Sequence, residues 1–130
     1  MAQHRGVGPN ILMPSWRFEH ISAVTLGVRD MAESVAFYAS LGLEVEYGGP
    51  NAAFTTMRAG QSFINLREVP VRATHGGIRV ILRVYGVDAL HRDLVEKGLA
   101  PSEPKDAAWG ERYFEVSDPQ GVVISFAEPL

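Results

Sequence analysis

The chain has 130 residues, of which 46% are hydrophobic and 21% are charged, which fits one compact domain or two half-size modules sharing a core. Its formal net charge is -3, with Lys and Arg dispersed among Asp and Glu, so neither nucleic acid nor a membrane is an expected partner. This charge pattern leaves a small molecule or another protein as the expected partner. The lack of cysteine excludes disulfides, thiolate zinc sites and cysteine nucleophiles.

Residues 1–15 are expected to form a flexible extension. Residues 1–9 have no apolar run and contain two glycines and a proline, so they do not resemble a secretion signal. The apolar stretches of the chain are far shorter than the roughly 20 residues that cross a bilayer. The expected location is therefore the cytoplasm.

A first module is predicted over residues 16–69. Apolar residues alternate with other residues over 24–28, which predicts a strand with one face on a core. Asp30 follows in the N-cap position of a helix, with Glu33 placed as in a capping box, and Gly42 supplies the left-handed residue that ends the helix. Alternating segments then predict strands near 43–47, 53–58 and 62–68.

A second module is predicted over residues 78–130, after a linker at 70–77 that contains a proline and paired glycines. A strand over 80–84 precedes a helix whose apolar stripe is Val87, Leu90 and Leu94. Gly98 ends this helix, and strands follow near 112–117 and 122–127. The sequence Asp-Pro-Gln-Gly between them is typical of a type I turn.

The two modules align with each other. Segment 24–28 matches 80–84, and the same alignment continues without a gap to the helix stop signals at 41–43 and 97–99. A second alignment matches 59–68 with 119–128. Two blocks in the same order indicate an internal duplication, and so an α+β protein of tandem βαβββ modules.

Both modules resemble the vicinal oxygen chelate superfamily, which includes glyoxalase I, extradiol dioxygenases, fosfomycin-resistance enzymes and bleomycin-binding proteins. The residues that carry the resemblance are VTLGVRD at 24–30, FY at 37–38, LGLE at 41–44, WGERYF at 109–114, DPQG at 118–121 and ISF at 124–126. The resemblance spans about residues 20–129. It implies an incompletely closed eight-stranded barrel around a ligand cavity. It also implies a homodimer, since members commonly dimerise and open sheet edges favour association.

Metal-dependent members of this superfamily take two ligands from each module, typically His or Glu, on its first and last strands. The resemblance places these positions at Ala23, Asn65, Arg79 and Ser125. Ala has no donor atom, Asn and Ser offer neutral oxygens, and the guanidinium repels a cation, whereas transition metals bind imidazole, carboxylate or thiolate. We therefore expect no metal and no cofactor. The alternative is a one-residue slip in the alignment, in which Glu115 or Glu44 would contribute.

The side chains that alternate with the core residues of each strand are expected to line the cavity. The predicted ligand-binding residues are Phe63, Asn65, Arg67, Arg79, Arg83, Trp109, Tyr113 and Ser125. Apolar walls with a few polar anchors are typical of a small-molecule site. Trp109 is placed at a loop near the mouth of this cavity.

Arg79 and Arg83 require anionic partners, because an unpaired guanidinium is costly in a site of low dielectric constant. One alternative is an internal network in which Glu115, or a carboxylate of another subunit, pairs with them. The other is a bidentate clamp on a carboxylate or phosphate of the ligand. If the protein is catalytic, Glu115 is the candidate acid or base.

The leading hypothesis is a glyoxalase/bleomycin-resistance-like protein without metal, which binds or transforms a small ligand that carries an anionic group. One alternative is a resistance protein that sequesters a cationic antibiotic between two subunits. Another is a metal-dependent glyoxalase or dioxygenase, if the alignment of the ligands is wrong. A further alternative is a noncatalytic interaction module whose cavity is filled by its own side chains.

Overall fold

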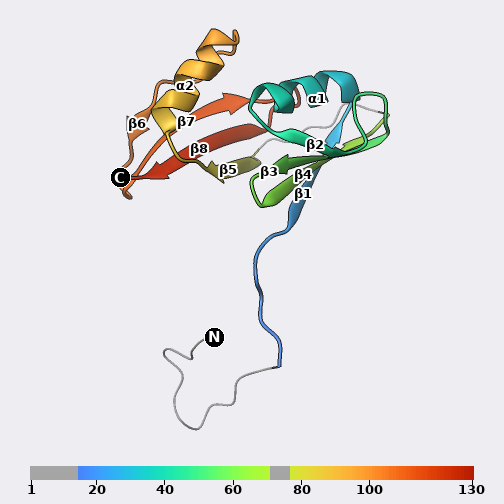
Figure 1. The fold of residues 1–130 in the computed structure, drawn as a ribbon, viewed down its shortest axis with the longest axis horizontal. Helices are drawn as coiled ribbons and strands as arrows, with labels where there is room; N and C mark the ends of the chain where they lie inside the picture. Colours follow the sequence, from blue (N-terminus) through green and yellow to red (C-terminus); the bar gives the residue numbers. More distant parts are fainter. Residues whose placement is uncertain (1–14, 71–76) are drawn as a thin grey trace.

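The computed structural model describes residues 15–70 and 77–130, and these form two βαβββ repeats (Figure 1). The first repeat consists of β1 (Ala23–Val28), α1 (Met31–Ser40), β2 (Glu44–Tyr47), β3 (Phe54–Ala59) and β4 (Ser62–Glu68). The second consists of β5 (Arg79–Arg83), α2 (Val87–Glu96), β6 (Lys105–Asp106), β7 (Glu111–Ser117) and β8 (Val123–Pro129). The predicted α+β class is confirmed, with the tandem repeat that the internal alignment indicates.

Each repeat forms its own four-stranded sheet, in the order β1-β4-β3-β2 and β5-β8-β7-β6. The first strand of each repeat runs parallel to the last, and the other pairs are antiparallel. Both helices lie on the same side of the sheets (Figure 1). The opposite side, which we call the uncovered face, carries no helix. The barrel is thus incompletely closed, as predicted.

The core lies between the sheets and their helices. It is one cluster that draws on both repeats, with Leu26, Ile64 and Leu66 from the first and Phe114 and Phe126 from the second. These side chains are at most 2% exposed. Their strand neighbours therefore point to the uncovered face, as the period of two predicts.

The two helices are capped in different ways. Asp30 caps α1, where its carboxylate accepts the N–H of Glu33 at 3.0 Å, as predicted. Gly86 precedes α2 and has no side chain to offer, and the carboxylate of Glu128 on β8 accepts the N–H groups of Gly86 and Val87, both at 2.9 Å. These two hydrogen bonds lower the pKa of Glu128.

A buried hydrogen bond joins the repeats. The Tyr38 hydroxyl on α1 donates to Asp118 Oδ2 at 2.6 Å. Asp118 Oδ1 accepts the N–H groups of Gln120 and Val122, which fixes the turn before β8. Burial and the contact with Asp118 together raise the pKa of Tyr38 far above its ordinary value.

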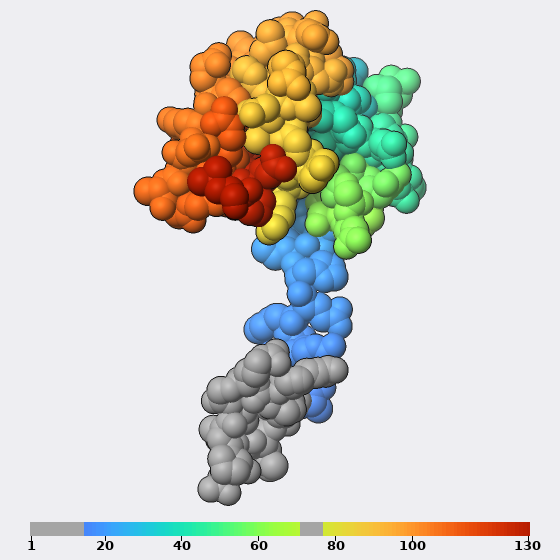
Figure 2. Space-filling view, turned by 60° about the vertical axis from the view of Figure 1, so that its left-hand side comes forward, coloured from blue at the N-terminus to red at the C-terminus, as the bar shows by residue number. Residues whose placement is uncertain are grey.

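Residues 15–22 run away from the body of the protein without helix or strand (Figures 1 and 2). They expose three large apolar side chains, Trp16, Phe18 and Ile21. Most of the predicted extension, and residues 71–76 of the predicted linker, lie outside the described residues. Within the described ranges, neither helix is long and apolar enough to cross a membrane.

Candidate functional site

A pocket of about 250 Å³ lies on the uncovered face of the second sheet. Its lining residues are Arg79, Ile81, Trp109, Glu111, Tyr113, Glu115, Ser125 and Ala127. They come from β5, β7, β8 and the loop before β7, and we call this the Arg79 pocket. The structure thus brings together four of the predicted ligand-binding residues and the predicted acid or base.

The charged centre of the pocket is an ion pair between Arg79 Nη1 and Glu115 Oε2. The side chains are 48% and 29% exposed, so water screens the pair and its contribution to stability is small. Arg79 is thus paired within the chain, which is the first of the two alternatives expected from the sequence. A guanidinium has five N–H donors, so Arg79 keeps donors for a ligand while paired.

An aromatic pair forms one wall of the pocket. The rings of Trp109 and Tyr113 are 5.6 Å apart at an interplanar angle of 31°. Trp109 Nε1 donates to Glu111 at 2.9 Å, and the ammonium of Lys105 lies 5.6 Å from the centre of the Tyr113 ring. Trp109 is 68% exposed, so much of its surface is available to a planar ligand.

Three predicted ligand-binding residues lie in the other sheet. Phe63, Asn65 and Arg67 are on β4, which belongs to the first repeat. The amide of Asn65 is held on both sides, since its oxygen accepts the Thr56 hydroxyl at 2.8 Å and its nitrogen donates to Thr25 at 3.2 Å. Phe63 meets Arg79 in a separate cleft of about 390 Å³ that both repeats line, whereas the Arg79 pocket takes its residues from the second repeat.

Arg83 is likewise separated from Arg79, although both lie on β5. Four residues along a strand put the two Cα atoms about 13 Å apart. Arg79 lines the Arg79 pocket, whereas Arg83 lines a different cleft. The two guanidinium groups thus border different pockets, and a joint clamp on one ligand anion stays a prediction.

The four positions that carry metal ligands in metal-dependent relatives do not fit a metal here. Both amide atoms of Asn65 are engaged in hydrogen bonds, and Arg79 brings a positive charge. Glu115, which an alignment slip would recruit, is paired with that charge, and Glu44 is paired with Arg58 on the first sheet. No group of three or more His, Cys, Asp or Glu side chains gathers within residues 15–70 and 77–130.

Two open βαβββ sheets with both helices on one side define a class of two-module α+β folds. The chain belongs to the glyoxalase/bleomycin resistance protein/dioxygenase superfamily, whose family model matches residues 17–126. No curated protein matches the chain.

Solved structures share this fold. A putative glyoxalase family protein from Bacillus anthracis has a TM-score of 0.77 at 21% identity, covering 91% of this chain and all of its own. A bleomycin-binding protein in complex with bleomycin has a TM-score of 0.72 at 17% identity, covering 87% and 100%. TnmS3, an antibiotic-binding protein from a Streptomyces species, has a TM-score of 0.70 at 26% identity, covering 88% and 99%.

Two lining residues are not among the predicted ligand-binding residues. Ile81 lies between the two arginines of β5, on the strand face that the alternation predicts to line the cavity. Glu111 was missed, although it continues the alternation of Tyr113 and Glu115 along β7. The pairing of Arg79 with Glu115 crosses from β5 to β7 over β8. The strand order that places them together is a property of the fold.

Proposed function

We propose that this protein binds a small organic ligand in the Arg79 pocket without a metal, and that the ligand carries a planar apolar part and an anionic group. The observation that carries the proposal is the gathering of Arg79, Glu115, Trp109 and Tyr113 around one pocket. The planar part stacks on the exposed Trp109 ring, and the anionic group accepts hydrogen bonds from the free N–H donors of Arg79.

Binding is the function that this pocket supports best, and catalysis would add a role for Glu115. Its carboxylate is the group that would accept or return a proton, because it lies on the wall of the pocket beside Arg79. Ser125 lies opposite Glu115 in the β7–β8 register and offers a hydroxyl to the ligand. A reaction at this site would be metal-independent.

The second candidate function is sequestration of a cationic antibiotic. Glu111 and Glu115 place two carboxylates against one guanidinium in the pocket, so a ligand ammonium would also find a partner. The bleomycin-binding protein and TnmS3 share the fold and are named for antibiotic binding.

Isothermal titration with two probes of matched shape separates these functions. The first proposal expects 2-naphthoate to bind about tenfold tighter than 2-naphthylmethylammonium, and Arg79→Gln to remove that preference. Trp109→Ala should weaken both probes by about tenfold. Arg92→Gln, on the exposed side of α2, is the matched control and should change neither.

Tighter binding of the ammonium probe, together with binding of bleomycin, would favour sequestration. If neither probe nor bleomycin binds, both functions are wrong. Binding that survives Arg79→Gln and Trp109→Ala unchanged would place the ligand elsewhere and refute the proposed site.

We also propose a homodimer. Residues 15–22 expose Trp16, Phe18 and Ile21, which is apolar surface that a second copy of the chain would bury. Light scattering of the full chain should give twice the mass of one chain, and a monomer at about 100 µM would contradict it. The cytoplasmic location stays a prediction, which fractionation of cells that express a tagged chain would test.

A further inference from the structure

A second and larger cleft lies where the two repeats meet. Its volume is about 860 Å³, within the range of small-molecule sites. The lining residues are Leu41, Gly42, Leu43, Ala59, Gly60, Gln61, Ser62, Ile81, Leu82, Arg83, Val84, Tyr85, Leu90 and Phe126. They come from the end of α1, the β3–β4 turn, β5 with the chain after it, α2 and β8, and we call this the inter-repeat cleft. In Figure 2 the yellow chain of β5 and α2 borders the green and cyan chain of the first repeat.

The cleft combines apolar walls with one charge. Leucine, isoleucine, valine and phenylalanine make up half of its lining, and Gln61 and Ser62 add neutral polar groups. Arg83 is the one charged side chain among the described residues that line it. A ligand that fits this surface is mostly apolar and carries a single negative charge.

Arg83 is free to bind that charge. It forms no ion pair or hydrogen bond with the described residues, in contrast to Arg79 on the same strand. The β8 partner of Arg83 is Ala127, which carries no charge. Glu128, the next residue of β8, points to the opposite face of the sheet, where its two oxygens accept the N–H groups at the start of α2.

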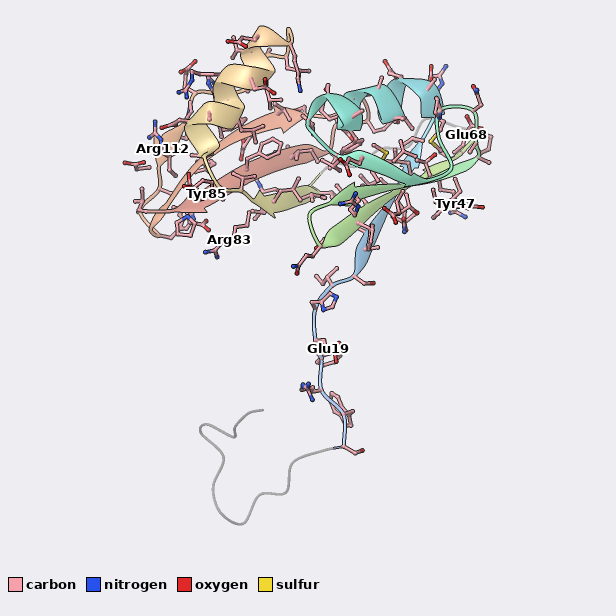
Figure 3. All side chains as sticks on the ribbon, viewed as in Figure 1. Glu19, Tyr47, Glu68, Arg83, Tyr85 and Arg112 are labelled. Atoms are coloured by element: carbon pink, nitrogen blue, oxygen red, sulfur yellow. The ribbon has the colours of Figure 1, made fainter. Side chains whose placement is uncertain are left out.

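Tyr85 shows that the cleft has apolar surface to bury. Its side chain is 100% exposed at the junction of β5 and α2, and Figure 3 labels it beside Arg83 at this end of the strand. Ile81, on the other side of Arg83, is 62% exposed. A ligand bound at Arg83 would shield both apolar side chains from water, which is the main source of affinity for an alkyl chain.

We propose that the inter-repeat cleft is a second binding site, which takes an alkyl carboxylate of medium chain length. The carboxylate binds the guanidinium of Arg83, and the alkyl chain lies against Leu41, Leu43 and Leu90. The site is independent of the Arg79 pocket, because its anchoring charge and most of its walls belong to other residues.

Decanoate, well below its micellar concentration, is the probe, and the full chain is used. We expect decanoate to bind one equivalent and decylammonium to bind at least about tenfold more weakly, because it would meet the charge of Arg83. Arg83→Gln should weaken decanoate about tenfold, and Tyr85→Ser should weaken both probes. Arg79→Gln and Arg92→Gln are controls that should leave decanoate binding within about twofold.

A decanoate analogue with a terminal photoreactive diazirine locates the alkyl chain. Mass spectrometry of the labelled protein should find the label in residues 41–43, 59–62 or 84–90. Label in residues 109–115 would assign decanoate to the Arg79 pocket and overturn the second site. Absence of binding at about 1 mM decanoate, or equal affinity for decylammonium, would overturn it as well.

Failure of this site and failure of the proposed function are distinguishable. Naphthoate reports on the Arg79 pocket through Arg79→Gln, and decanoate reports on the cleft through Arg83→Gln. If Tyr85→Ser converts a dimer into a monomer and decanoate does not bind the wild type, the cleft is an interface between two copies of the chain, which refutes the ligand site.

Discussion

Replacing Tyr38 with phenylalanine removes one hydroxyl from the buried hydrogen bond that joins the repeats. The hydroxyl donates to Asp118 Oδ2 at 2.6 Å, and the two residues are 0% and 6% exposed. Asp118 Oδ1 already has two N–H donors, so the substitution leaves Oδ2 without a donor. Hydrogen bonds to charged groups contribute about 1.5–3 kcal/mol, and we expect Tyr38→Phe to lower the free energy of unfolding by about 2 kcal/mol.

Urea and thermal unfolding followed by circular dichroism would measure this loss. In a domain of this size about 2 kcal/mol corresponds to a decrease in Tm of roughly 8 °C. Tyr47→Phe is the matched control, because that side chain is 67% exposed, and it should change the free energy by less than about 0.5 kcal/mol. A Tyr38→Phe variant as stable as this control would show that the hydrogen bond does not hold the repeats together.

The same pair predicts a loss of stability in alkali. The pKa of Tyr38 is raised in the folded state, so its neutral form is favoured by folding. Its contribution is fully present below the unfolded pKa of about 10 and is lost as the pH rises above that value. Between about pH 10 and 11 the wild type should therefore lose stability more steeply than Tyr38→Phe. Parallel profiles of the two proteins would show that Tyr38 is not the cause of the alkaline loss.

Further predictions concern α2, the glycine turns and metal. Glu128 has a lowered pKa, so the stability that its cap on α2 contributes is present above the unfolded pKa and is lost as the pH falls. Glu128→Gln should therefore flatten the acid side of the stability profile below about pH 5. It should also speed hydrogen exchange at the N–H of Val87, which Glu128 accepts. Gly48→Ala should destabilise by more than about 2 kcal/mol in urea unfolding, because its Cβ would overlap the carbonyl oxygen of Phe54 at a φ of 83°. Gly42→Ala, with no atom within 4 Å and a φ of 104°, should cost only about 1 kcal/mol. Dialysis against EDTA should leave naphthoate binding unchanged, and a loss that zinc or manganese restores would contradict the metal-free site.

Local signals in the sequence predict most of the helices and strands, because the residues that start or end each of them lie within a few positions of it. Asp30 and Gly42 mark the ends of α1, and the turn at 118–121 forms with a hydrogen bond from Gly121 N to Asp118 O at 3.0 Å. The alternation along each strand also predicts which side chains reach the uncovered face. The α+β class therefore follows from short-range patterns repeated twice.

Features that depend on distant segments could not be predicted in the same way. Glu128 caps α2 from β8, and no motif near Gly86 indicates it. The short β6, Lys105–Asp106, pairs with β7 in a Pro-rich segment where alternation cannot be detected. The predicted site residues lie in several places, because periodicity assigns a face of the strand but not the distance between two separate sheets.

Native mass spectrometry of the protein purified in EDTA would decide whether the Arg79 pocket holds an organic ligand without a metal. We expect the wild type to retain an organic molecule of small mass and no metal ion, and we expect Trp109→Ala to release that molecule while Arg92→Gln does not. One equivalent of bound metal, or a molecule that Trp109→Ala retains as firmly as the wild type, would contradict binding in the Arg79 pocket.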